Sequence, residues 1–588
     1  MFKPVTLGFV ASLSLSSPLL AQNIRTSDRL HLSYPPATHQ TTAEQIFFIG
    51  SAPSNGTVTI NGQSINRSNL GHFAPSLPLQ VGTNEFTIEF RNASGQTTQL
   101  RRTITRKAST PPVSNSLKNL YPAVNIARQP DELICFQAQA PAEAQVSISL
   151  ANQTVSLQPQ DSVSLPPNSA VLTLTNDALV TGFSGQHKGC VAFEKIGNLG
   201  KATYTMTLNG VTTSATSEGG VEILNTQAPE AIAVTSLAGV ARTGASTNFS
   251  RLTPLPQGTQ ASVTGKEGAW LRLDYGAWIK AAETTTLSTT VPPRSLIRSV
   301  RSQTFADRTD VIFPLQTLVP VTVQQNDDTF SLILHNTVAQ TDTIYLSQSP
   351  VIRRLDWHPV DTDTIRYDFR LKQSQQWGYE LRYEGTNLIL SLRHPPKLSA
   401  NSLTGATILL DPGHGGNESG AAGSTGYPEK AVNLVISQKI QAALEAKGAT
   451  VNLTRTTDID VSLGDRQKAI REQKPTLALS VHYNALPDAG DAENTAGIGM
   501  FWYNAHAHDL AQFLHDELVQ NLNRPSYGVF WNNLALTRPH EAPSVLLELG
   551  FMINPTEFEW ITDPQAQDQL AQAIATAIEV WLQQKTEF

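Results

Sequence analysis

The sequence predicts a multidomain chain in which all-β modules precede a C-terminal α/β domain with a mostly parallel sheet flanked by helices. Up to about residue 396, short segments alternate apolar and polar residues with the period of two that is typical of strands. Beyond residue 405, apolar runs alternate with helical patterns, and such crossovers join parallel strands. At 588 residues the chain is also too long for one hydrophobic core.

The charge and the N-terminus bear on where the protein acts. The net charge is −7 and the basic residues do not cluster, so nucleic acid is excluded as a partner. Lys3 precedes a mostly apolar run from Val5 to Leu20, which predicts a secretory signal peptide, residues 1–21, cleaved after Ala21. The alternative is a buried N-terminal helix. We expect a protein secreted across the inner membrane to the periplasm or cell wall, and not an integral membrane protein.

Two β-sandwiches are expected first. Residues 23–107 alternate in the manner of Asn84–Phe90 and contain an Asn-Gly turn, so this region resembles a bacterial immunoglobulin-like module. His72 is predicted to be a solvated loop residue. A proline-rich linker, 108–115, leads to a second predicted sandwich at 122–225.

Two further β modules follow. Residues 230–285 resemble a bacterial SH3-like barrel, in which Trp270 and Trp278 are expected in the core, although they could instead stack on a sugar or peptide. Residues 294–396 are expected to form another β-sandwich, which could serve envelope targeting. These modules could bind envelope or division proteins.

The chain has two cysteines, Cys135 and Cys190, both in the second predicted sandwich. In an oxidising compartment they could form a disulfide bridge, and two separate buried thiols explain the sequence nearly as well.

Polar residues follow the ends of three apolar runs in the C-terminal domain, 405–588. Ile408–Leu410 leads into a glycine-rich turn that carries His414, Leu477–Val481 leads into His482, and Ser544–Leu547 leads into Glu548. Glu429 opens a helical pattern. Because the carboxyl ends of parallel strands share one edge of a sheet, we expect these four side chains to converge.

Two imidazoles and one carboxylate with an open fourth position form the ligand set of a catalytic zinc ion. We therefore predict His414, Glu429 and His482 as metal ligands. Glu548 remains free to act as general base and acid. A carboxylate directly after an apolar run rarely occurs without a partner or a task.

The motifs DPGHGG, Glu429-Lys430, SVHYN and LLELGF resemble those of the zinc-dependent N-acetylmuramoyl-L-alanine amidases over roughly Thr407 to Leu582. The resemblance implies a peptidoglycan hydrolase that cleaves the amide between N-acetylmuramic acid and L-alanine during cell-wall remodelling or daughter-cell separation. It places the metal ligands and the catalytic glutamate on the four positions named above. It also implies substrate or supporting roles for Asn484, Arg455, Arg466 and Arg538. Glu418 stands where the family more often has Asp, in a shell that shapes the loop.

Some members of this family carry a long insertion that folds as a helix over the zinc. Here only a short polar segment, Leu486–Ala496, follows Asn484, so we expect an open cleft with control in the β domains.

Three other functions and several other polar residues fit parts of the sequence. A metallopeptidase could use the same metal set, and a pseudoenzyme could bind the wall through its β modules. A glycosidase with Glu418 and Glu429 as its carboxylates would leave both histidines unexplained. Five other residues are expected to face solvent: His506, His508, His515, and the loop residues His540 and Glu541, of which the last two could instead border the cleft.

Overall fold

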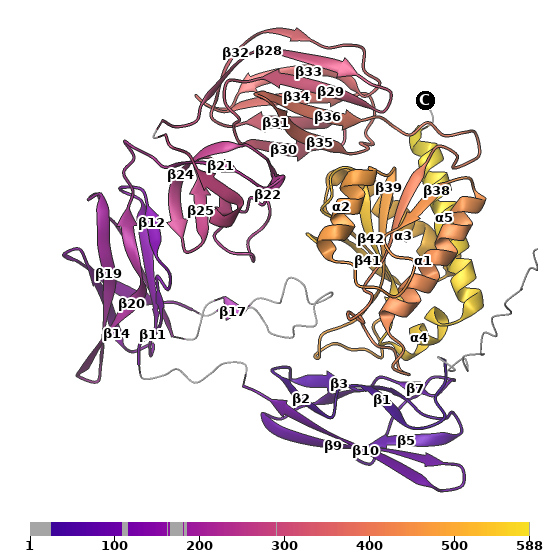
Figure 1. The fold of residues 1–588 in the computed structure, drawn as a ribbon. Coiled ribbons are helices and arrows are strands. Elements are labelled where there is room, and N and C mark those ends of the chain that lie inside the picture. Colours follow the sequence, from indigo (N-terminus) through magenta and orange to yellow (C-terminus); the bar gives the residue numbers. More distant parts are fainter. Residues whose placement is uncertain are drawn as a thin grey trace, which may run out of the picture.

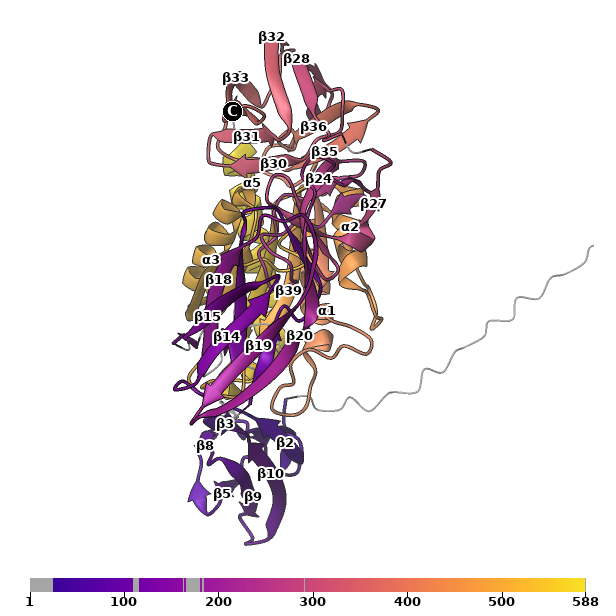
Figure 2. The same cartoon turned by 90° about the vertical axis from the view of Figure 1, so that its left-hand side faces the viewer.

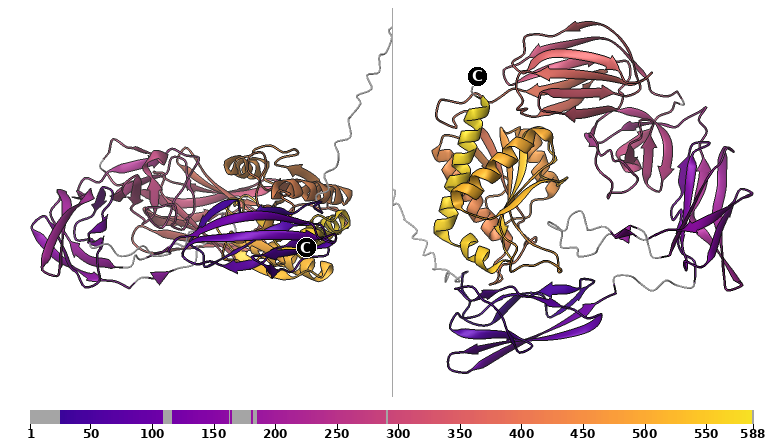
Figure 3. Two further views of the ribbon diagram at one scale, coloured as in Figure 1. Left: turned by 90° about the horizontal axis from the view of Figure 1, so that it is seen from below. Right: turned by 180° about the vertical axis from the view of Figure 1, so that it is seen from behind.

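The computed structural model describes residues 25–108, 116–161, 163–164, 180–181, 185–289 and 291–586. The predicted signal peptide and most of the predicted linker lie outside these residues. Within them, four β regions and a C-terminal α/β region follow one another along the chain (Figure 1). Seen from the front and from behind, the regions are arranged around a ring, so that the C-terminal region lies beside the first (Figures 1 and 3).

The first region packs a five-stranded sheet, β2-β10-β9-β5-β6, against smaller sheets around a core that includes Phe48, Phe73 and Ile88. Its strands are β1 (His31–Tyr34), β2 (Thr38–Thr41), β3 (Gln45–Phe47), β4 (Ile49–Ser51), β5 (Gly56–Ile60), β6 (Gln63–Ser64), β7 (His72–Phe73), β8 (Ser76–Pro78), β9 (Gly82–Asn92) and β10 (Thr97–Arg106). The prediction for His72 is wrong: the residue lies in β7, fully buried, with its ring 5.2 Å from that of Phe558.

The second and third regions share one path of hydrogen-bonded strands. The link is β12 (Ile126–Arg128), which pairs with β20 of the second region and with β24 of the third. The remaining strands of the second region are β11 (Lys118–Tyr121), β13 (Leu133–Gln139), β14 (Gln145–Leu150), β15 (Gln153–Pro159), β16 (Val163–Ser164), β17 (Val180–Thr181), β18 (Gln186–Ala192), β19 (Gly197–Leu208) and β20 (Val211–Ile223). A disulfide joins Cys135 and Cys190, which are register partners on β13 and β18.

The third region surrounds a small core that includes Leu255, Leu273 and Ile279. Trp278 is buried beneath the guanidinium groups of Arg128 and Arg272, as expected of a core tryptophan, whereas Trp270 is partly exposed. The elements are β21 (Ala231–Val234), β22 (Ala238–Gly239), β23 (Leu255–Pro256), β24 (Gln260–Glu267), β25 (Trp270–Leu273), β26 (Trp278–Lys280), η1 (Ala281–Glu283) and β27 (Thr284–Thr286).

The fourth region consists of a five-stranded sheet, β32-β28-β29-β36-β35, and a four-stranded sheet, β30-β31-β34-β33. Aromatic residues such as Phe313, Phe330 and Phe369 are fully buried in its core. The strands are β28 (Ser295–Thr304), β29 (Arg308–Pro314), β30 (Val321–Gln325), β31 (Thr329–Leu334), β32 (Thr337–Tyr345), β33 (Ile352–Pro359), β34 (Ile365–Leu371), β35 (Tyr379–Glu384) and β36 (Asn387–Arg393).

The C-terminal region is built on a six-stranded sheet of order β38-β37-β39-β42-β40-β41, in which only the β40–β42 pairing is antiparallel. Its central strands are buried on both faces, which explains their near-continuous apolar runs. The strands are β37 (Thr407–Pro412), β38 (Thr450–Leu453), β39 (Leu477–Asn484), β40 (Ile498–Trp502), β41 (Ser526–Trp531) and β42 (Ser544–Phe551).

Helices cover this sheet with their apolar faces. In α1, Val432, Ile436 and Ile440 recur at helical spacing and are fully buried, and the helix ends before Gly448, whose φ of 97° suits glycine. None of the described helices is long and apolar enough to cross a membrane. The helices are α1 (Glu429–Ala446), α2 (Leu463–Gln473), η2 (Ala505–Ala507), α3 (His508–Leu522), α4 (Pro555–Ile561) and α5 (Pro564–Thr586).

The first region contacts the C-terminal region through the segment that follows β39, at the lower end of the view in Figure 2. The Tyr34 hydroxyl donates a hydrogen bond to the buried carboxylate of Asp488, and His39 Nε2 lies 2.9 Å from the same carboxylate. Phe47 and Ile49 share an apolar cluster with residues of this segment and with Phe551 at the end of β42. The segment 486–496 is therefore held against another module, and no helix is assigned to its residues, all of which are described.

The fourth region contacts the opposite side of the C-terminal region. Trp377 enters its core and packs edge to face against Trp581, with ring centroids 5.6 Å apart. His506 is buried between the two regions: its Nδ1 lies 3.0 Å from Gln325 Nε2, and its Nε2 lies 3.2 Å from the Ala542 carbonyl oxygen. The prediction that His506 is solvated is therefore wrong, whereas its neighbour His508 is exposed as expected.

We expect acid to weaken this interface through His506. Burial, opposed by a hydrogen bond with Ala542, lowers the pKa of His506 to about 4. Because the folded state disfavours the protonated ring, the stability present above pH 6.5 is lost as the pH falls from 6.5 through 4. The expected loss between pH 7 and pH 5 is about 2 kcal/mol. Melting temperatures measured across that range should fall less steeply for His506→Gln than for wild type, and parallel pH profiles would contradict this expectation.

Candidate metal centre

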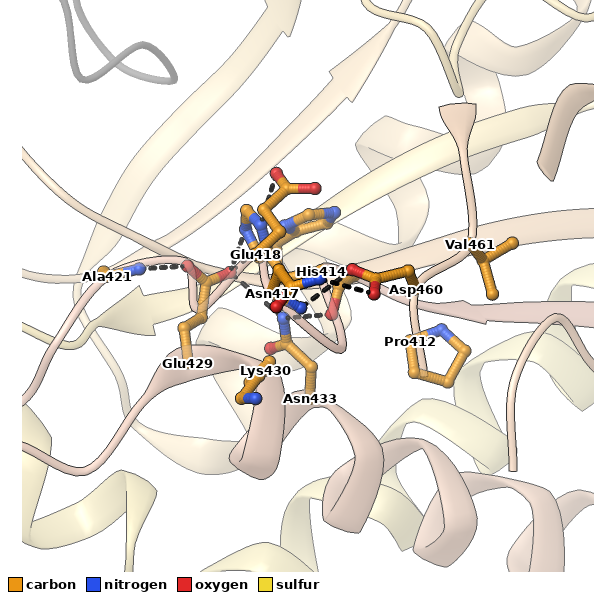
Figure 4. A network of polar contacts seen from close by, with 12 residues as sticks. Pro412, His414, Asn417, Glu418, Ala421, Glu429, Lys430, Asn433, Asp460 and Val461 are labelled. Carbon is orange, nitrogen blue, oxygen red and sulfur yellow. Dashed lines mark hydrogen bonds and ion pairs between the residues drawn. The ribbon is translucent and has the colours of Figure 1, made fainter. Parts of the chain in front are cut away.

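Three polar side chains converge beyond the carboxyl ends of β37 and β39. Nε2 of His414 lies 3.2 Å, and Nδ1 of His482 lies 3.1 Å, from Oε1 of Glu429, and the two imidazole rings stand edge to face. One ligand atom from each of the three residues can be chosen so that all lie within 4.8 Å of one another, which is close enough to hold a metal ion. Figure 4 shows His414 and Glu429 facing each other across this cluster.

Glu429 is fixed at the start of α1 by several donors. The backbone N–H groups of Ala421 and Tyr483 donate to its carboxylate at 2.9 and 3.2 Å, and Asn433 Nδ2 donates at 3.1 Å. Burial by itself would raise the pKa of Glu429, yet the contacts with His414 and His482 hold it well below its usual value. The carboxylate is therefore ionised and ready to bind a cation.

His414 adopts a left-handed backbone conformation, with φ at 59°, in the glycine-rich turn. Its Nδ1 lies 2.9 Å from Oε1 of Glu418, so the second ring nitrogen is held by a carboxylate, as is common for metal-binding histidines. Glycine is required on the other side of the turn, because a Cβ at Gly413 would lie 2.2 Å from the ring of His482.

Two buried guanidinium groups hold the backbone of this turn. Arg455 donates to the carbonyl oxygens of Pro412 and Gly413 at 2.9 and 2.8 Å, and Arg466 donates to that of His414 at 2.7 Å. Arg466 also forms an ion pair of 2.5 Å with Asp411, and both side chains are buried. Both arginines therefore hold the backbone of the turn in place.

Glu548 lies in β42 as the register partner of His482 on β39. It is 1% exposed, and its Oε2 has no hydrogen-bond partner among the described residues. Burial, reinforced by the charge of Glu429, raises the pKa of Glu548 well above its usual value. The rim thus combines a cation-binding cluster with a neighbouring carboxyl group that can carry a proton.

The remaining predicted positions differ in their placement. Asn484, at the end of β39, is 2% exposed, and its Nδ2 is buried with no partner among the described residues. Arg538 makes its side-chain hydrogen bonds with Asn533 and lines a separate cavity, so the structure does not bring it to the cluster. Asn433 was not singled out by its sequence, although a polar residue four positions after Glu429 lies on the same helix face.

Two predictions about solvent-facing residues are corrected here. His515 is only 7% exposed, and its Nε2 lies 2.8 Å from the hydroxyl oxygen of Ser526 in β41. Glu541 is also buried, and the ring of His540 stacks on Tyr379 of the fourth region.

The fold and this cluster define the C-terminal region as an α/β enzyme domain with a candidate metal centre. More particularly, it is an amidase domain, because residues 408–580 match the model of the N-acetylmuramoyl-L-alanine amidase family.

Several known proteins are similar to this part of the chain. The probable cell wall amidase LytH of Staphylococcus aureus is 36% identical over 183 residues, which make up 31% of this chain and 60% of that protein. The chain thus spans 60% of the length of this relative. An N-acetylmuramoyl-L-alanine amidase from Clostridium difficile 630 has 30% identity over 32% of this chain and 100% of its own, with a TM-score of 0.30. The catalytic domain of CwlV from Bacillus (Paenibacillus) polymyxa var. colistinus has 28% identity. The match covers 30% of this chain and 98% of that domain, with a TM-score of 0.29.

Proposed function

We propose that the protein is a zinc-dependent N-acetylmuramoyl-L-alanine amidase that hydrolyses the amide between N-acetylmuramic acid and L-alanine in peptidoglycan. The observation that carries this proposal is the convergence of His414, Glu429 and His482 beside the unpartnered carboxyl oxygen of Glu548. The family model for residues 408–580 supports the choice of bond.

The residues present fit a zinc ion. Two imidazoles and one ionised carboxylate are the ligand types of catalytic zinc sites, and the orphaned oxygen of Glu548 needs a cation or a water molecule nearby. We infer that His414, Glu429 and His482 hold the ion. When bound, zinc supplies a Lewis acid that polarises the scissile carbonyl and lowers the pKa of water.

Glu548 moves the proton in the proposed reaction. It takes a proton from the attacking water and delivers it to the nitrogen of the departing alanine, while the water oxygen forms a new bond to the lactyl carbonyl carbon. Burial, together with the charge of Glu429, raises the pKa of Glu548, which helps this carboxyl group to hold the proton until it passes to the leaving nitrogen. The buried position of Glu548 keeps its carboxyl group aligned on the strand.

The surrounding residues orient this chemistry. Asn433 and the N–H groups of Ala421 and Tyr483 fix the carboxylate of Glu429, and Arg455 and Arg466 fix the turn that carries His414. We further propose that the cleft is open on the side of the segment 486–496, because that segment is held by the first region through Asp488. Control of activity would then reside in the β modules and in localisation to the periplasm or cell wall.

Metal analysis combined with mass spectrometry tests the proposal. Chelation should abolish cleavage of defined muropeptides by the full chain, and zinc should restore it. The expected products are a muramic acid with a free lactyl carboxyl group and a stem peptide with a free alanine amine. Cleavage between two amino acids would instead identify a metallopeptidase, and zinc binding without any cleavage would identify a pseudoenzyme.

A further inference from the structure

A cavity of about 860 Å³ lies where three regions of the chain meet. The third region contributes Arg251 and its neighbours, the fourth contributes the strand β35, and the amidase domain contributes Tyr503 and Arg538. Its lining includes none of the residues of the candidate metal centre. The cavity is therefore a distinct feature that the proposed hydrolysis does not use.

Three guanidinium groups in this lining, those of Arg251, Arg471 and Arg538, have no ionic partner among the described residues. Across the described residues, no carboxylate oxygen lies within 4.0 Å of Arg251 or Arg538, and Arg538 makes only weak hydrogen bonds of 3.2 and 3.4 Å with Asn533. Behind them, Arg242 is 7% exposed, and its Nε is buried without a partner among those residues. Three positive charges are thus gathered with no described carboxylate within 4.0 Å, although the more distant charge of Glu283 acts on Arg242 and Arg251.

The other charged groups in the lining do not neutralise them. Glu380 forms its ion pair with Lys474 at 2.7 Å, and Arg382 is paired with Asp310 and Glu384. Glu541 accepts a hydrogen bond from the backbone N–H of His540.

The electrostatics show the cost of this arrangement. Burial, together with the neighbouring charges of Arg251 and Arg242, lowers the pKa of Arg538 to about 10. A bound anion would offset both the lost hydration and the mutual repulsion. Guanidinium groups present several N–H donors in a planar array that matches an oxyanion such as a carboxylate.

Tyr503 adds an aromatic surface beside the arginines. Its ring stacks on that of Trp531 at a centroid distance of 5.2 Å, and Trp531 is 58% exposed. The Tyr503 hydroxyl donates to the backbone oxygen of Arg251 at 3.3 Å, which keeps the ring next to the positive charges. Aromatic rings of this kind offer an apolar face with one polar end.

We propose that this cavity between the three regions binds a carboxylate group of a peptidoglycan fragment through Arg251 and Arg538. The inference rests on the proposed function, because hydrolysis of the muramyl amide leaves a carboxylate on the lactyl group, and the stem peptide carries carboxylates of its own. The enzyme would then be attached to wall material at a point that is separate from the metal centre.

Calorimetric titration of the full chain, with its metal removed, tests this binding. N-acetylmuramic acid and N-acetylglucosamine form a matched pair of probes, since only the first carries a carboxylate, and a free stem tetrapeptide is the second carboxylate source. We expect at least one carboxylated probe to bind ten times or more tightly than N-acetylglucosamine. Binding of the sugar or of the peptide alone assigns the source of the carboxylate.

The variant Arg251→Gln/Arg538→Gln should lose at least tenfold in affinity for that probe, whereas Arg298→Gln, which alters an exposed arginine of β28 outside the cavity, should bind as wild type does. The double variant should also unfold at the same temperature or higher, because a repulsion is removed. Unchanged affinity in the double variant, or no binding of either carboxylated probe, would overturn the proposal. A lower unfolding temperature would do so as well, by showing that the arginines are structural.

Failure of this inference can be separated from failure of the proposed function. Hydrolysis of a short soluble muropeptide by the zinc-loaded Arg251→Gln variant should match that of wild type, because Arg251 lies in the third region, outside the metal centre. A wild-type protein that binds the carboxylated probe but cleaves no muropeptide would refute the amidase proposal and leave the anion site in place.

Discussion

The variant Glu548→Gln should bind zinc as wild type does and lose turnover by at least about a hundredfold, the scale of general acid–base catalysis. Gln has nearly the same shape, but it cannot accept and return a proton. The site of change is buried beside His482 on the neighbouring strand, so the metal-binding side chains should stay in place. Steady-state hydrolysis of a defined muropeptide and zinc content by elemental analysis together measure both effects.

A stability measurement separates lost chemistry from lost structure in this variant. The folded state disfavours an ionised Glu548, so replacing it with a neutral side chain should leave metal-free protein at least as stable as wild type at pH 7. Glu472→Gln, which alters an exposed carboxylate on α2, is the matched control and should be fully active. A Glu548→Gln enzyme that cleaves at a near-normal rate would remove this residue from the proposed role.

The second large effect is expected from Arg466→Met. This change leaves the buried carboxylate of Asp411 without its cationic partner and frees the carbonyl oxygen of His414. Breaking a buried ion pair in this way destabilises a protein by about 3–5 kcal/mol. Denaturant unfolding followed by tryptophan fluorescence should show that loss in the transition of the amidase domain.

The same variant should also bind zinc more weakly, because the turn that carries His414 loses one of its two supports. Arg471→Met is the control on the same helix: Arg471 is exposed and makes no ion pair among the described residues, so its loss should change stability by no more than about 0.5 kcal/mol. Equal unfolding midpoints for the two variants would show that the Arg466–Asp411 pair contributes little.

The sequence was most informative where function and strand ends coincide. His414, His482 and Glu548 each follow or interrupt an apolar run, so parallel pairing of β37, β39 and β42 brings them to one rim, as the pattern indicated. Glu429 was found because it opens a helix whose apolar spacing is regular. These inferences depend on local periodicity and on the geometry of parallel sheets.

Burial caused by distant modules was not visible in the sequence. His72 and His506 are surrounded by polar or mixed residues in the chain, and each is covered by a segment far away in the sequence, near Phe558 and Gln325 respectively. For the same reason the pairing of β12 with β24 was missed, since each strand satisfies its own alternation wherever it docks. Local pattern specifies which face of a strand is apolar, but it does not name the surface that covers it.

The hydrogen bonds from Arg455 and Arg466 to the backbone of the glycine-rich turn have a consequence for how the enzyme acquires its cofactor. Arg455 and Arg466 hold the backbone of the turn in which His414 adopts its left-handed conformation, so the site should persist in chelated protein. The proposed zinc ion would then bind and dissociate rapidly and reversibly at a preformed site, without refolding of the domain.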